Sequence, residues 1–147
     1  MKPVYESSMR PLMASEPSRI LMVEDSPSDV FLFRMMLDDD PTGREYIITD
    51  VPKLTDAFKR LAAMEEYDLI ILDMNLLDMD GVTSVVVLNA EAPDVPIIVY
   101  SGMDSPLLKQ KALDAGARRY LVKGTESIHT IKKIIDEVLY EDLKEEA

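Results

Sequence analysis

Short runs of large aliphatic residues alternate with longer amphipathic segments from residue 19 to about residue 140. Uninterrupted aliphatic runs are typical of strands that are buried on both faces, as in a parallel sheet covered by helices. The longer segments repeat their apolar residues at intervals of three and four, which is typical of helices with one buried face. The alternation predicts an α/β domain with a parallel sheet between two layers of helices.

The aliphatic runs predict strands at residues 20–23, 46–48, 69–72, 95–100 and 119–122. The amphipathic segments predict helices at residues 27–37, 54–61, 82–90, 106–115 and 128–140. The third helix is ambiguous, because Val85-Val86-Val87 favours a strand whereas the flanking Gly81 and Pro93 favour a helix between strands. We expect a doubly wound, five-stranded parallel sheet in the order 2-1-3-4-5, with helices on both faces.

The chain of 147 residues is long enough for one domain with its own hydrophobic core and too short for two. Residues 1–18 contain three prolines and no long apolar run, so we expect a flexible N-terminal arm. The domain itself is expected over residues 19–147, with its last helix ending near residue 140 before an acidic tail. No apolar stretch approaches the roughly 18 residues that cross a bilayer.

The formal net charge of −12 argues strongly against nucleic acid as a ligand of this chain, because phosphates are bound by lysine and arginine. The sequence contains no cysteine, which excludes disulfides, thiolate metal sites and a thiol nucleophile. This composition is consistent with a protein of the cytoplasm, whose thiols are kept reduced.

Polar residues follow the C-terminal ends of four predicted strands, namely Glu24, Asp25, Asp73, Ser101 and Lys123. Parallel strands place these ends at one edge of the sheet, and ligands bind where the strand order reverses. Because the first and third strands are neighbours, we expect three carboxylates to converge there. Carboxylates so close would repel one another unless a cation intervened, and an oxygen-only cluster suits Mg²⁺, with Mn²⁺ as an alternative.

This set of groups is also equipped for phosphoryl transfer. Asp73 can act as a nucleophile toward a phosphoryl group. A divalent cation and Lys123 would stabilise the charge on the phosphoryl oxygens, and Ser101 could donate a hydrogen bond to one of them.

Four motifs, ILMVEDSPSD, DLIILDMNLLDMDG, VPIIVYSG and ALDAGARRYLVKG, follow one another at these intervals along residues 19 to about 140. In this order they resemble the receiver domain of two-component response regulators, which has a flavodoxin-like fold. The resemblance implies that Asp73 is the phosphoacceptor. It also implies that Asp25, Asp73 and the backbone carbonyl of Asn75 bind the metal ion, with Glu24 acting through a metal-bound water.

The resemblance further implies a conformational switch formed by Ser101 and Tyr120, in which the aromatic ring moves inward as the hydroxyl engages the phosphate. The phosphodonor of the family is a phosphohistidine on a sensor histidine kinase or a histidine phosphotransfer protein. The usual output face, which also supports homodimers, corresponds here to residues 106–115, 119–122 and 128–140.

Two residues depart from the family pattern where proline is usual. Leu77 replaces a proline in the loop after Asp73, which predicts a less rigid loop. Gly124 replaces a proline after Lys123, so a cis peptide bond is not expected there. The replacements of aspartate by Glu24 and of threonine by Ser101 keep the chemistry of the site.

Two other functions are compatible with parts of the pattern. A phosphatase of the haloacid dehalogenase type also uses an aspartyl phosphate, but it carries its nucleophile on the first strand and a second aspartate two residues later, where this chain has Asn75. A degenerate receiver that acts only as a binding scaffold is the other alternative, and the complete polar set argues against it.

Asp78 and Asp80 are expected only to cap the helix at residues 82–90.

Overall fold

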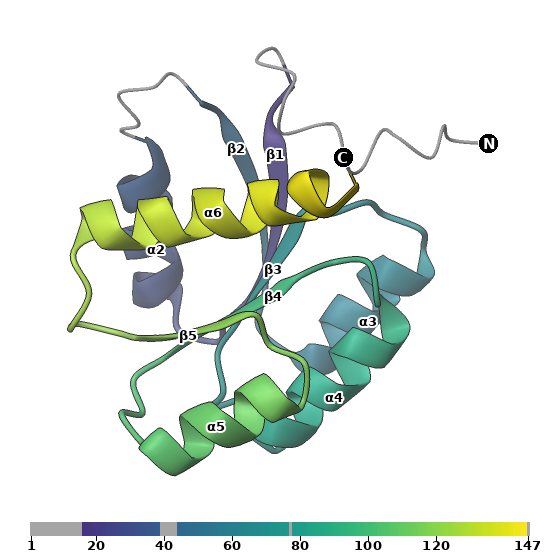
Figure 1. Ribbon diagram of the computed structural model, residues 1–147. Coiled ribbons are helices and arrows are strands. Elements are labelled where there is room, and N and C mark those ends of the chain that lie inside the picture. The colour runs from purple at the N-terminus through teal and green to yellow at the C-terminus, as the bar shows by residue number, and fades with distance from the viewer. Residues whose placement is uncertain (1–15, 39–43, 77, 147) are drawn as a thin grey trace.

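The computed structural model describes residues 16–38, 44–76 and 78–146, and describes side chains only as far as residue 140. Its strands are β1 (Ser18–Val23), β2 (Tyr46–Val51), β3 (Leu69–Leu72), β4 (Ile97–Ser101) and β5 (Arg119–Val122). All neighbouring strands pair in parallel, and their order in the sheet is β2-β1-β3-β4-β5 (Figure 1). The predicted doubly wound sheet and its strand order are confirmed.

The helices are α2 (Pro27–Asp38), α3 (Leu54–Ala62), α4 (Gly81–Glu91), α5 (Pro106–Asp114) and α6 (Ile128–Glu146). Figure 1 shows α2 and α6 on one face of the sheet and α3, α4 and α5 on the other. Each face has its own core, because successive residues of a buried strand point to opposite sides. In β3, for example, Leu69 and Ile71 pack with α2 and α6, whereas Ile70 and Leu72 pack on the opposite side.

The ambiguous valine-rich segment is helical, as expected. Val85 and Leu88 are fully buried in the core beneath α4, whereas Val86 is half exposed. A helix therefore buries one side of this segment, and packing outweighs the strand preference of its valines. Gly81 is required at the start of this helix, because a Cβ atom there would lie 2.6 Å from the carbonyl oxygen of Met74.

Several boundaries differ from the sequence-based expectation; β4, for example, begins at Ile97 and not at residue 95. β1 begins at Ser18, inside the segment expected to be the N-terminal arm, and β2 continues to Val51 because residues 49–51 pair with β1. The backbone of α6 continues to Glu146, past the expected helix end near residue 140. No glycine or proline interrupts residues 141–146, so nothing in the sequence stops the helix there. The expectations for residues 1–15 and for Leu77 lie outside the described residues.

Among the described residues, no helix combines the length and the apolar character needed to cross a membrane.

Candidate functional site

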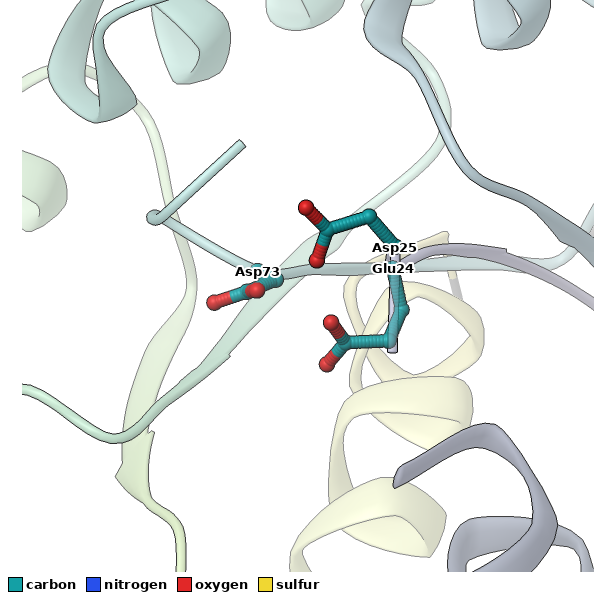
Figure 2. Close-up of side chains that lie close together, drawn as sticks. All are labelled: Glu24, Asp25 and Asp73. Atoms are coloured by element: carbon teal, nitrogen blue, oxygen red, sulfur yellow. The ribbon is translucent and has the colours of Figure 1, made fainter. Parts of the chain in front are cut away.

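The strand register brings the predicted polar residues together at one edge of the sheet. Val23 pairs with Leu72, so the residues that follow them, Glu24 and Asp73, leave adjacent strands side by side. The backbone N–H of Asp73 also donates a hydrogen bond of 3.0 Å to the carbonyl oxygen of Val23. The three carboxylates of Glu24, Asp25 and Asp73 point into one small volume (Figure 2).

The carboxylate cluster has the composition of a magnesium site. Each of Glu24, Asp25 and Asp73 offers one carboxylate oxygen, and these oxygens all lie within 4.8 Å of one another. Mg²⁺ binds its oxygen ligands at about 2.0–2.1 Å, so carboxylates this close to one another could hold the ion directly or, for one of them, through a bound water. Glu24 and Asp73 are buried whereas Asp25 is exposed, which leaves an open side for water or a substrate oxygen.

Lys123 lies among the carboxylates, as predicted, but it contacts one group that the sequence did not indicate. Its Nζ atom donates hydrogen bonds to Oε1 of Glu24 and to Oδ2 of Asp29, the latter at 2.9 Å. Oδ2 of Asp73 is 3.8 Å away. Lys123 therefore lies among three carboxylates. Burial lowers its pKa, but the hydrogen bonds that it donates to Glu24 and Asp29 and the negative charge of Asp73 raise the pKa overall.

The backbone conformation after Lys123 explains why a glycine can stand at position 124. This glycine has φ +82°, and a Cβ atom there would meet no neighbour, so its role is conformational. Positive φ is accessible to glycine at little cost. No cis peptide bond occurs among the described residues, in agreement with the sequence-based expectation.

The pKa of Glu24 is raised from 4.5 to about 7, mainly by burial and also by the neighbouring Asp73, while Lys123 opposes the change. Between pH 4.5 and about pH 7, the folded state binds more protons at Glu24 than the unfolded state does. The unfolding free energy should therefore fall as pH rises. We expect the metal-free protein to lose about 2 kcal/mol of stability between pH 5 and pH 7.5. Urea unfolding in the presence of a chelator measures this loss. Glu24→Gln, which cannot titrate, should remove it, and an equal pH dependence in this variant would contradict the assignment.

Ser101 and Tyr120, the predicted switch pair, lie near each other on the adjacent strands β4 and β5. Ser101 is fully buried, and its Oγ accepts a hydrogen bond of 3.3 Å from the backbone N–H of Met103. The ring of Tyr120 is buried, and its hydroxyl donates a hydrogen bond of 2.7 Å to the carbonyl oxygen of Met103. Burial raises the pKa of Tyr120, and hydrogen bonding with the Ser101 hydroxyl partly offsets this. Both side chains thus belong to one hydrogen-bonded group around Met103.

The loop between Asp73 and α4 contains one correction to the sequence-based expectations. Asp80 occupies the N-cap position of α4, as expected, but its side chain makes no capping hydrogen bond to the backbone and instead accepts one of 2.6 Å from the Thr83 hydroxyl. Asp78 does not cap this helix. Its carboxylate instead accepts hydrogen bonds from the backbone N–H groups of Leu54 and Thr55, at the start of α3. The expectation for Asp78 was wrong because the sequence indicates only the helix that follows the loop, whereas the fold places this carboxylate at the start of α3.

Asp29 is the other residue of the site whose contact the sequence-based interpretation missed. It lies in the first turn of α2, where its backbone N–H donates a hydrogen bond of 3.4 Å to Oγ of Ser26. Because the helix begins directly after Asp25, its first turn also passes beside the cluster. The sequence carries no signal for this contact, because an acidic residue in the first turn of a helix is already explained by the helix dipole.

Comparison with known proteins gives consistent results. Residues 20–136 match the response regulator receiver domain family. The protein RcaC of Microchaete diplosiphon is 36% identical over 116 residues, which cover 79% of this chain and 17% of that protein. The cell cycle transcriptional regulator CtrA of Caulobacter vibrioides is 30% identical over 116 residues, which cover 79% of this chain and 48% of that protein. The chain thus spans less than half the length of either relative.

Solved structures share the fold. A CheY-like receiver domain protein from Methanospirillum hungatei JF-1 has a TM-score of 0.77 at 23% identity, covering 88% of this chain and 99% of that chain. The signal receiver domain of a LuxO repressor protein from Vibrio parahaemolyticus, described as putative in its name, has a TM-score of 0.76 at 27% identity, covering 88% and 95%. The sequence match and the fold lead to the same conclusion: this chain belongs to the response regulator receiver domain family.

Proposed function

We propose that this receiver domain accepts a phosphoryl group on Asp73 in a Mg²⁺-dependent reaction and thereby changes its conformation to control a partner or an output domain. The observation that carries the proposal is the convergence of Asp73 with Glu24, Asp25 and Lys123 at one edge of the sheet. The domain would act as a signalling module that modifies itself and not as an enzyme that turns over an external substrate.

The chemistry follows from the groups around Asp73. A carboxylate oxygen of Asp73 would attack the phosphorus atom of a phosphohistidine, forming a P–O bond while the P–N bond breaks and the imidazole leaves. Asp25, Asp73 and the backbone carbonyl of Asn75 would hold Mg²⁺ directly, and Glu24 would hold it through water. The bound ion would offset negative charge on the phosphoryl oxygens.

Lys123 and Ser101 would contact the transferred phosphoryl group. Nζ of Lys123 lies 3.8 Å from Oδ2 of Asp73, so a short movement away from Asp29 would bring it to a phosphoryl oxygen. Ser101 is buried, and turning its hydroxyl toward the phosphate would break its contact with the Met103 backbone. Because Tyr120 hydrogen-bonds the same backbone segment, its ring would respond to this change.

We infer the partners from family membership. The phosphodonor would be a sensor histidine kinase or a histidine phosphotransfer protein in the cytoplasm. The face formed by α5, β5 and α6 would transmit the change to an effector or to a second copy of the domain. The net charge of −12 makes nucleic acid an unfavourable ligand for this chain itself.

The proposal is tested by incubating the protein with acetyl phosphate and Mg²⁺ and measuring its intact mass. We expect one phosphoryl group per chain, and we expect a chelator to prevent its addition. Absence of the adduct would instead favour a degenerate receiver that acts as a scaffold. Sustained hydrolysis of a simple phosphate ester would favour a phosphatase.

A further inference from the structure

Helix α3 begins without a cap of its own. Lys53 occupies its N-cap position in an extended conformation, with φ −132° and ψ 151°, and makes no side-chain hydrogen bond to the helix. A lysine side chain has no acceptor atom, so it cannot satisfy the free N–H groups of the first turn. These donors must find a partner from another part of the chain.

The partner is Asp78, from the loop between β3 and α4. Its Oδ1 accepts a hydrogen bond from the N–H of Leu54, and its Oδ2 accepts one from the N–H of Thr55, both at 3.2 Å. Although desolvation raises the pKa of this carboxyl, the hydrogen bonds from Thr55 and Leu54 lower it overall. A carboxylate at a helix N-terminus is also favoured by the helix dipole. One side chain therefore joins two elements that are distant in sequence.

The same loop begins at the candidate metal site and carries one of its expected ligands, the backbone carbonyl of Asn75. It begins after Asp73, whose Oδ1 accepts a hydrogen bond of 3.2 Å from the backbone N–H of Asn75. It ends at Gly81, where α4 approaches the carbonyl of Met74 closely. Both ends of the loop are thus held by local contacts. Asp78 ties the middle of the loop to a different element by hydrogen bonds. This loop has leucine where the family usually has proline.

We propose that Asp78 is a positioning residue: by tying the loop to the start of α3, it holds the backbone carbonyl of Asn75 in place for the metal ion. This inference rests on the proposed function, because it assigns Asn75 as a ligand. It goes beyond that function because the metal affinity of the site would depend on the side chain of Asp78, which touches neither the ion nor the phosphoryl group.

The test compares two variants that lose the same charge. Asp78→Ala removes both acceptor oxygens, and we expect the dissociation constant for Mg²⁺, measured by isothermal titration calorimetry, to rise about tenfold. Asp78→Asn keeps one acceptor oxygen, and asparagine caps helices about as well as aspartate, so the rise should be about twofold. Equal dissociation constants in the two variants would overturn the proposal, because the effect would then be one of charge alone.

A second substitution separates positioning from helix stability. Lys53→Ser gives α3 an ordinary N-cap residue, and in the Asp78→Ala background it should restore the thermal unfolding midpoint followed by circular dichroism. It should leave the Mg²⁺ dissociation constant about tenfold above that of the wild type, because the loop remains untied. Recovery of both quantities would overturn the proposal and leave Asp78 with a purely structural role.

Failure of this inference differs from failure of the proposed function. A wild-type protein that binds Mg²⁺ but takes up no phosphoryl group would end the proposed function, while the binding comparison would still decide the role of Asp78. A wild-type protein that binds no Mg²⁺ would overturn both, before any variant is made.

Discussion

Asp73→Asn should abolish phosphoryl uptake from acetyl phosphate, lowering the rate at least about a hundredfold. An amide is a far weaker nucleophile than a carboxylate and carries no charge to attract the metal ion. The substitution is nearly isosteric, and the side-chain oxygen can still accept the hydrogen bond from the N–H of Asn75, so the loop should keep its path. Intact mass spectrometry after incubation with Mg²⁺ and acetyl phosphate measures the loss, and peptide mapping of the wild-type adduct locates the modified residue.

Asp104→Asn is the matched control, because Asp104 is an exposed carboxylate in the loop after β4. This variant should acquire the phosphoryl group as fully as the wild type does. If the Asp73→Asn protein gained the same mass as the wild type, the phosphoacceptor would be a different carboxylate, with Asp25 the first to examine. Loss of the adduct in both variants would show that the site responds to net charge and not to one nucleophile.

The main elements of the site could be predicted from sequence because a parallel sheet imposes them. Aliphatic runs locate the strands, and parallel pairing places the residue after each run at one edge. This reasoning brought Glu24 and Asp73 together from positions about fifty residues apart, and the pairing of Val23 with Leu72 agrees with it. Lys123 followed from the same rule, since it comes directly after β5.

The contacts of Asp29 and Asp78 could not be predicted in this way, because they depend on how elements lie in three dimensions. A carboxylate in the first turn of a helix has a sufficient local explanation in the helix dipole, so nothing in the sequence directs Asp29 toward Lys123. A carboxylate in the loop that leads into a helix, such as Asp78, likewise has a sufficient explanation as a cap for that helix. That Asp78 caps α3 instead follows from the packing of α3 against α4 across one face of the sheet.

Lys123→Ala should leave the fold intact while lowering phosphoryl uptake about a hundredfold, which is typical of removing one group that stabilises charge in a transition state. The lysine is the cation nearest to Asp73 among the contacts of the described residues. Its removal leaves the buried Glu24 without its partner, but this carboxyl has a pKa of about 7 and can take up a proton instead of remaining charged. Far-UV circular dichroism should therefore match the wild type, and global unfolding would show that Lys123 is structural.

The same substitution should tighten Mg²⁺ binding severalfold, since Nζ of Lys123 contacts Glu24 and repels a divalent cation in the cluster. If Lys123 stabilises charge, its removal should raise the affinity for Mg²⁺ and lower phosphoryl uptake. If Lys123 were merely structural, its removal would lower both. Lys109→Ala, which removes an exposed lysine of α5, should change neither quantity. Unchanged phosphoryl uptake in Lys123→Ala would place the stabilising charge elsewhere and would remove Lys123 from the site.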